Sequence, residues 1–318
     1  MNQSSTVSTG RSTIRLNRIK TYFSKPHNVI LLIMGIVLTV TTVAPIVAIV
    51  QDTFKIHAGT IDAHLTGQAS GYTLVNYIDL FTSRLAMSNL WMPLINTVLL
   101  AVGTCVVAIV FGGLFAFLIT RTNLSCRKYL SSIFIFPYIM PQWTLAVVWQ
   151  NLFNSNAVTG TSNGLLAATL GVQMPLWWCK GLFPSLVVLG LHYAPFAYIL
   201  IGGIFRNMDA NLEEAATILD TPKWKTMFKI TLPMLSPTMF MVTILSIINS
   251  FQVFDLVNIM TQGGPGRSTN VLVYRIYQEG FQKLQFGYAS AMAYFLFIII
   301  MVITLIQFRG QKKWVNYM

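Results

Sequence analysis

Six long apolar stretches constrain this chain more than any other feature of its sequence. A helix needs about 20 apolar residues to cross a hydrocarbon core about 30 Å thick, because each residue rises about 1.5 Å. Only 9% of the 318 residues are Asp, Glu, Lys or Arg, against about 25% in soluble proteins. The sequence therefore predicts an all-α polytopic membrane protein with six transmembrane helices, at 29–50, 95–119, 129–153, 183–205, 236–257 and 286–308.

Two further apolar segments are predicted to be short interfacial helices on the outer surface rather than spans. Residues 72–90 are interrupted by Asp79 and Arg84. Residues 165–179 are short, contain a glycine and a proline, and end in Trp177-Trp178, a composition typical of the membrane–water interface.

The distribution of basic residues predicts the orientation. Fifteen Lys and Arg fall in the two tails and in the second and fourth connections, and six fall in the opposite connections. Because cytoplasmic loops retain basic residues, both termini are expected in the cytoplasm of a bacterial or archaeal cell, with the chain in the plasma (inner) membrane. The predicted organisation is a cytoplasmic tail (1–28) near anionic lipid headgroups, a six-helix domain (29–308) and a second tail (309–318).

The connection at 211–233 is predicted to form two short cytoplasmic helices. Asn211 is a good N-cap, and the first helix should end near Asp220. Thr221-Pro222 suits the start of the second helix, which Pro233 should close. The apolar stripes of these helices must be covered, either by a docked partner or by the rest of the chain, and the residue pattern leaves both open.

The same connection resembles the EAA loop of the permease subunits of binding-protein-dependent ABC importers. The family pattern is Glu-Ala-Ala, three residues, Gly, nine residues and Ile-x-Leu-Pro. This chain has the same spacing, with Asp220 in place of the glycine. The resemblance implies that a cytoplasmic ATPase docks here, on Glu214, Ala215, Ala216, Asp220, Ile230, Leu232 and Pro233.

The C-terminal part resembles the carbohydrate branch of that family, on Gln262-Gly-Gly-Pro-Gly-Arg-Ser-Thr-Asn270 and Phe286-Gly-Tyr-Ala-Ser-Ala-Met-Ala293. The first half is also similar to the iron and polyamine branches. The resemblance implies a second related permease subunit, two ATPase subunits that bind ATP and Mg, and an external substrate-binding protein as partners.

The sequence shows no motif for ATP binding, metal binding or catalysis. It contains no Gly-x-x-x-x-Gly-Lys-[Ser/Thr] motif to hold ATP phosphates. Its four histidines and three cysteines show no metal-ligand spacing, and no catalytic arrangement stands out. We therefore expect no enzyme activity, no cofactor, no metal and no nucleic-acid partner, with ATP hydrolysis left to partner subunits.

Polar residues within the predicted spans are candidates for a substrate path, because such side chains usually face the bundle interior or water. Asn249, Gln252 and Asp255 are three residues apart and would sweep one side of an unbroken fifth span, beside Phe251. Amides and carboxylates suit sugar hydroxyls. Interhelical hydrogen bonding is the alternative for each. Further candidates are His192 and Tyr193 and, between two prolines in a predicted irregular helix, Tyr138 and Gln142.

The function expected from sequence is a permease subunit of an ATP-driven importer for a sugar or oligosaccharide, neutral or acidic, working by alternating access. One alternative is an importer for polyamine, iron or another small solute. An alternative of a different class is an ion-coupled secondary transporter with Asp255 as its coupling carboxylate, although inverted repeats with broken helices are not evident.

Overall fold

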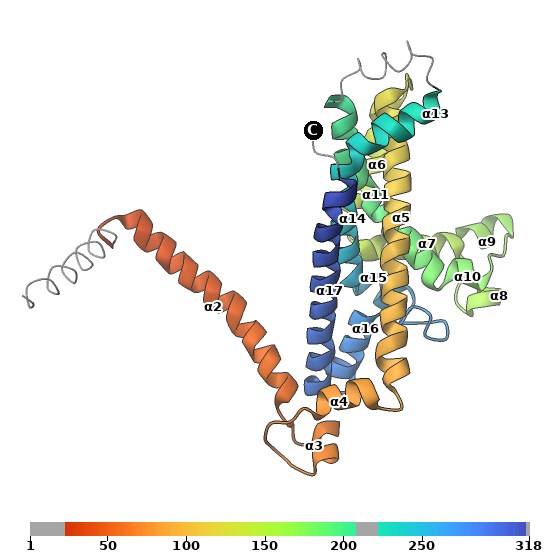
Figure 1. Cartoon of the computed structure of the whole chain (residues 1–318). Helices are drawn as coiled ribbons and strands as arrows, with labels where there is room; N and C mark the ends of the chain where they lie inside the picture. Colours follow the sequence, from red (N-terminus) through yellow and green to blue (C-terminus); the bar gives the residue numbers. More distant parts are fainter. Residues whose placement is uncertain (1–22, 208–221, 316–318) are drawn as a thin grey trace, which may run out of the picture.

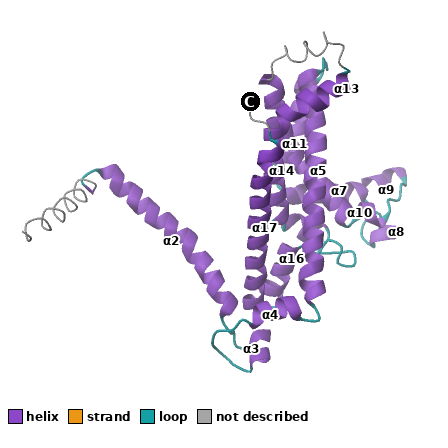
Figure 2. Ribbon diagram, viewed as in Figure 1, coloured by secondary structure: helices purple, strands orange, loops and turns teal. Residues whose placement is uncertain are grey.

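The computed structural model describes residues 23–207 and 222–315. These residues form helices joined by short connections, with one isolated β-bridge between Lys55 and Tyr72 (Figure 2). The predicted all-α class is therefore confirmed for this part of the chain. Apart from the first, the long helices run side by side in a bundle (Figure 1).

Five long helices form the frame of the fold, and each is long and apolar enough to cross a membrane. Four predicted spans, 29–50, 95–119, 183–205 and 286–308, lie within single helices as expected. The five helices are α2 (Pro26–Phe54), α5 (Met92–Arg121), α11 (Leu182–Asn207), α14 (Leu232–Phe251) and α17 (Phe286–Trp314).

The third predicted span, 129–153, is not one straight helix. It consists of α6 (Arg127–Ile139) and α7 (Gln142–Phe153), which meet at an angle of 108°. Pro141 causes the break, because it has no N–H for the helix and its ring forces the residue before it, Met140, into an extended conformation. If the bent pair counts as one span, the described chain has six spans, as predicted.

The fifth predicted span differs at both ends. Pro233 does not stop the preceding helix, because α13 (Lys223–Thr226) runs through a π-helical turn, η2 (Met227–Thr231), directly into α14. That wider turn pairs the Leu232 N–H with the Met227 carbonyl, so the chain stays helical up to the proline. At the other end α14 stops at Phe251, and a separate helix, α15 (Asp255–Met260), follows.

The two segments predicted to be interfacial consist largely of short helices. In 72–90, α4 (Val75–Thr82) is separate, but η1 (Met87–Trp91) continues into α5, so the end of that segment belongs to a long helix. Residues 165–179 form two short helices rather than a span. The remaining elements are α3 (Ile61–Thr66), α8 (Asn156–Thr159), α9 (Leu165–Leu170), α10 (Leu176–Cys179), α16 (Leu272–Tyr277) and η3 (Gln278–Gln282).

The centre of the bundle is the close packing of α5 against α11. A Cβ atom added at Gly112 would lie 2.5 Å from the Ala194 carbonyl oxygen and 2.5 Å from the Ala197 Cβ. Gly190 is packed as tightly against Val107. Small residues let transmembrane helices approach this closely, and the resulting contact area stabilises the pair.

Helix α2 stands apart from the bundle (Figure 1). None of the residues in its most apolar 18-residue window is buried by the described chain. Within the described residues, α2 is attached at its C-terminal end, where Asn76 of α4 donates a hydrogen bond to the Thr53 carbonyl at 3.1 Å. An apolar helix of this length must be covered by lipid or by another protein.

Candidate functional site

Four of the predicted path residues, Tyr138, Gln142, His192 and Tyr193, meet where the α6–α7 break packs against α11; we call them the break cluster. The Gln142 Nε2 donates a hydrogen bond to the Tyr193 hydroxyl at 2.7 Å. The Tyr138 and His192 rings lie 5.8 Å apart between centroids. Residues separated by about 50 positions in sequence thus form one polar and aromatic group.

His192 holds the break through a backbone contact. Its Nδ1 lies 2.9 Å from the Pro137 carbonyl oxygen. In an unbroken helix this carbonyl would accept from the N–H of residue 141, which is a proline and has none. Because a carbonyl can only accept, the His192 Nδ1 carries the proton. The imidazole therefore replaces a lost helical hydrogen bond.

The members of the break cluster differ in accessibility. His192 and Tyr193 are buried, and both are occupied by hydrogen bonds inside the chain. Tyr138 is 41% exposed, and its ring stacks on Phe196 with centroids 5.9 Å apart. Within this conformation, Tyr138 is the member whose ring a passing solute can reach most readily.

The second group of predicted path residues lies at the end of α14. Asn249, Gln252 and Asp255 are all exposed in the described chain. They do not share one face of a continuous helix, as the sequence predicted, because α14 ends at Phe251 and the Gln252 N–H turns back to the Asn249 carbonyl at 3.2 Å. Asp255 instead begins α15, where the helix dipole favours a negative charge.

Phe251 has a different position from the one expected. It is 3% exposed and packs in a hydrophobic cluster with Leu80, Leu90 and Met292. Its surroundings favour a packing role over contact with a solute.

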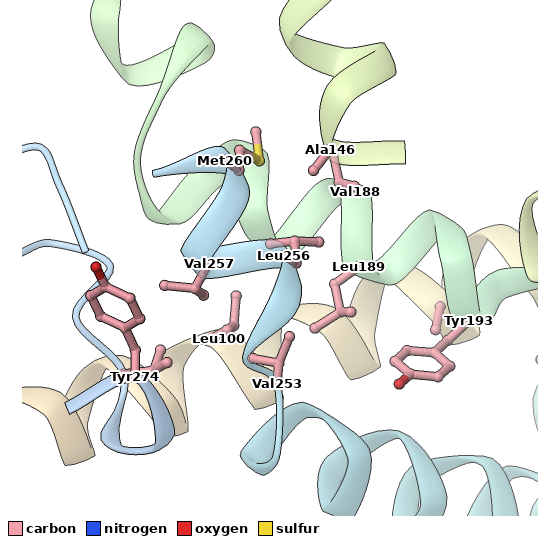
Figure 3. Packing of buried hydrophobic residues seen from close by; sticks show 12 residues of the cluster. Leu100, Ala146, Val188, Leu189, Tyr193, Val253, Leu256, Val257, Met260 and Tyr274 are labelled. Atoms are coloured by element: carbon pink, nitrogen blue, oxygen red, sulfur yellow. The ribbon is translucent and has the colours of Figure 1, made fainter. Parts of the chain in front are cut away.

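The two breaks flank the same helix. Figure 3 shows Val253 of the α14–α15 break and Leu256 of α15 beside the α11 residue Leu189, and Tyr193 of α11 belongs to the same hydrophobic cluster. Tyr193 also accepts the hydrogen bond from Gln142 at the α6–α7 break. A movement of α11 would therefore displace the residues that pack on it at both breaks.

The predicted docking residues are only partly described. Glu214, Ala215, Ala216 and Asp220 lie outside the described residues. Ile230, Leu232 and Pro233 lie in η2 and at the start of α14. A cavity of 280 Å³ lies between this region and α5 and α11, and its apolar lining includes Leu232 together with Met227, Phe117 and Phe205.

Sequence reasoning missed a charge network at the opposite end of the bundle. Glu279 is 3% exposed and lies 2.5 Å from Arg275 Nη2 and 2.9 Å from Lys283 Nζ. Arg275 also donates to the Asn89 side chain at 2.6 Å. The spacing of these three charged residues, four apart on a helix, was the available signal. Asn89 gives no such signal, because its contact depends on the tertiary fold.

Asp79 of α4 lies near this network. Its burial, and then the negative charge of Glu279, raise the pKa of the Asp79 carboxyl above its ordinary value. Both causes disfavour the ionised form. Within residues 23–207 and 222–315, no three potential metal ligands gather in one place.

The comparisons with known proteins identify the family. The model of the binding-protein-dependent transport system inner membrane component matches residues 108–313. The chain belongs to this family. It is therefore a multi-pass membrane permease component of an importer rather than an enzyme.

Several relatives and solved structures resemble the chain. It is 27% identical over 248 residues to the sn-glycerol-3-phosphate transport system permease protein UgpA of Pectobacterium atrosepticum, covering 76% of this chain and 80% of the relative. It is 27% identical over 254 residues to the multiple sugar-binding transport system permease protein MsmF of Streptococcus mutans, covering 75% and 80%. A chain of a bacterial alginate ABC transporter, crystallised with an alginate pentasaccharide-bound periplasmic protein, has 17% identity and a TM-score of 0.72 over 93% of this chain and 96% of its own.

Proposed function

We propose that this chain is one of two related permease subunits of an ATP-driven importer of a sugar or oligosaccharide in a bacterial inner membrane. The observation that carries the proposal is the family match over residues 108–313, which contains the Glu214-Ala215-Ala216 segment and its correctly spaced Ile230-Thr231-Leu232-Pro233 end. An external binding protein delivers the cargo, and two ATPase subunits bind ATP and Mg.

The carbohydrate cargo is supported by the names of relatives and by the chemistry of the exposed residues. A relative is named for multiple sugars, and a protein of the same fold belongs to an alginate transporter. Tyr138, Asn249, Gln252 and Asp255 offer hydroxyl, amide and carboxylate groups to sugar hydroxyls. The exposed ring of Tyr138 suits the apolar face of a pyranose.

A second permease subunit is supported by the uncovered surface of α2. This helix has 29 residues and an uncharged middle, and its most apolar window has no residue buried by its own chain. Membrane helices associate by close packing where the partner surface fits. We place α2 against the second permease, with its outer end fixed to α4 and α17 of its own chain.

Coupling to the ATPase follows from the continuity of one helix. From Lys223 to Phe251 the chain is helical without interruption through α13, η2 and α14, about 40 Å of helix at about 1.5 Å per residue. One end of this helical segment adjoins the predicted docking segment, and the other ends at the α14–α15 break. Closure of the ATPase pair thereby moves the break, and the spans alternate between outward-facing and inward-facing states.

The orientation in this proposal places α13 and the C-terminal end of α17 in the cytoplasm. These two ends lie at the same end of the bundle (Figure 1). The ends of α5 and α11 and the start of α6 carry Arg121, Arg206, Arg127 and Lys128, as expected for cytoplasmic connections.

The docking assignment is tested by purifying the assembled complex with Glu214→Arg and with Lys312→Glu as a charge-changing control at the same end. Glu214→Arg should release the ATPase during purification and abolish ATP-driven uptake, whereas Lys312→Glu should retain both. An intact, coupled Glu214→Arg complex would contradict the docking role.

The cargo is tested separately with the wild-type complex in vesicles. Sugars or oligosaccharides, delivered by the binding protein, should stimulate ATP hydrolysis, and sn-glycerol 3-phosphate and a polyamine serve as comparators. Stimulation by a comparator alone would replace the cargo assignment and leave the importer assignment intact. Uptake by this chain without ATP would favour the secondary transporter.

A further inference from the structure

An open cavity of 490 Å³ lies between the end of α5, the start of α6 and the end of α11. We call it the basic cavity. Its lining includes three cationic side chains, Arg127, Lys128 and Arg206, and a set of hydroxyls, Thr120, Ser131 and Ser132. A cavity of this size holds a phosphate group and the atoms attached to it.

The described residues around the basic cavity supply no acid to balance its charge. No Asp or Glu occurs from residue 80 to residue 208, so α5, α6 and α11 have none. Arg127, Lys128 and Arg206 form no ion pair with any residue in the part of the chain that the structure describes. Within that part, the positive charge of the cavity is open to an anion from outside α5, α6 and α11.

Two of the three cations occupy electrostatically unfavourable positions. Arg127 and Lys128 are the first two residues of α6, whose N-cap residue Cys126 makes no side-chain cap and whose first turn has no acid. The N-terminus of a helix is itself positive, so it repels cations and attracts anions. Arg206, by contrast, lies in the last turn of α11, where the helix dipole favours it.

The hydroxyls add directional contacts at the same place. The Ser131 Oγ lies 2.7 Å from the hydroxyl of Tyr198, which is buried. The Ser132 Oγ donates to the Lys128 carbonyl at 3.2 Å. Both serine oxygens keep lone pairs, and small rotations allow them to donate to an anion.

We propose that the basic cavity binds the phosphate-bearing headgroup of an anionic phospholipid. The position of the cavity relative to the membrane indicates the source of the phosphate. The cavity lies where two predicted spans end and one begins, which is the level of the lipid headgroups. Basic pockets between transmembrane helices are suited to such headgroups, and cation–phosphate hydrogen bonds are stronger than neutral ones. The proposal depends on the spans and requires neither the cargo nor the orientation proposed above.

The test compares the wild-type complex with Arg127→Gln/Lys128→Gln and with a matched control, Arg309→Gln/Lys312→Gln, which removes two exposed cations at the same end outside the cavity. Native mass spectrometry measures retained phosphatidylglycerol, and the thermal midpoint is measured with added phosphatidylglycerol, phosphatidylcholine or inorganic phosphate. The cavity variant should lose about tenfold in affinity for phosphatidylglycerol, and the control should match wild type.

A second readout separates binding from a structural role. Without added lipid, the cavity variant should unfold at the same temperature as wild type or higher, because two cations leave a helix N-terminus. Arg206→Gln, whose cation is favourably placed, should also lose the lipid response. An unchanged lipid response in both variants, an equal loss in the control, or a full stabilisation by inorganic phosphate alone would each overturn the assignment.

Discussion

The Nδ1 of His192 on α11 lies 2.9 Å from the carbonyl oxygen of Pro137 on α6. This contact satisfies a carbonyl that the proline four residues later leaves without a helical donor. The break between α6 and α7 is thus stabilised from another helix.

Replacing His192 by Phe keeps an aromatic ring but removes the donor. Because the Pro137 carbonyl is then unsatisfied inside the bundle, we expect a loss of about 1–3 kcal/mol in stability, measured by thermal unfolding of the purified complex. His192→Gln retains a donor and should recover part of this loss. Equal stability of His192→Phe and wild type would show that the contact does not hold the break.

Gly112→Ala should destabilise the α5–α11 pair. The new Cβ would meet the Ala194 carbonyl and the Ala197 side chain at 2.5 Å, an overpacking that costs about 1–3 kcal/mol. Gly203→Ala is the control, since nothing lies within 4 Å of its added Cβ and the helix gains about 0.5–1 kcal/mol from losing a glycine. Thermal unfolding of the two variants should therefore shift in opposite directions.

Arg275→Met should cost about 3 kcal/mol in stability, because it leaves the buried Glu279 with one fewer partner. Lys283→Met removes the other partner, but the Lys283 side chain is 52% exposed, against 12% for Arg275. Its loss should cost less than about 1 kcal/mol. Chemical denaturation of the two variants gives the comparison, and a larger effect of Lys283→Met would contradict the importance of burial.

Asp79→Asn should change how stability depends on pH. The pKa of Asp79 is raised in the folded chain by burial and by Glu279. Between its ordinary pKa and the raised value, the folded state binds more protons than the unfolded state, so wild-type stability falls as pH rises through that window. The thermal unfolding midpoint of Asp79→Asn minus that of wild type should therefore increase from acidic to neutral pH. A difference that is independent of pH would mean that Asp79 titrates normally.

The spans were predictable because the bilayer requires long apolar helices whatever their tertiary contacts. The details that differed depend on backbone geometry. The prolines of 129–153 indicated an irregular helix, but the 108° bend depends on how α7 packs. Pro233 indicates a helix end, and only the π turn before it, which has no clear sequence signature, allows the helix to continue.

The candidate path was predictable only in part. Polarity within the spans pointed to the residues that form the break cluster, and the structure brings all four together. Polarity alone did not show that His192 and Tyr193 are occupied by internal hydrogen bonds. The end of α14 at Phe251 was missed, since the residues Gln252-Val253-Phe254 contain neither proline nor glycine.

The near isolation of α2 has a consequence for biosynthesis. This helix leaves the ribosome before the other long helices of the described chain, and apart from its C-terminal end its shape does not depend on packing against those later helices. It can insert into the bilayer while the other helices are still being synthesised. Insertion of α2 and assembly of the remaining bundle are therefore separable events. The final position of α2 beside the bundle depends on lipid or a neighbouring subunit rather than on the chain itself.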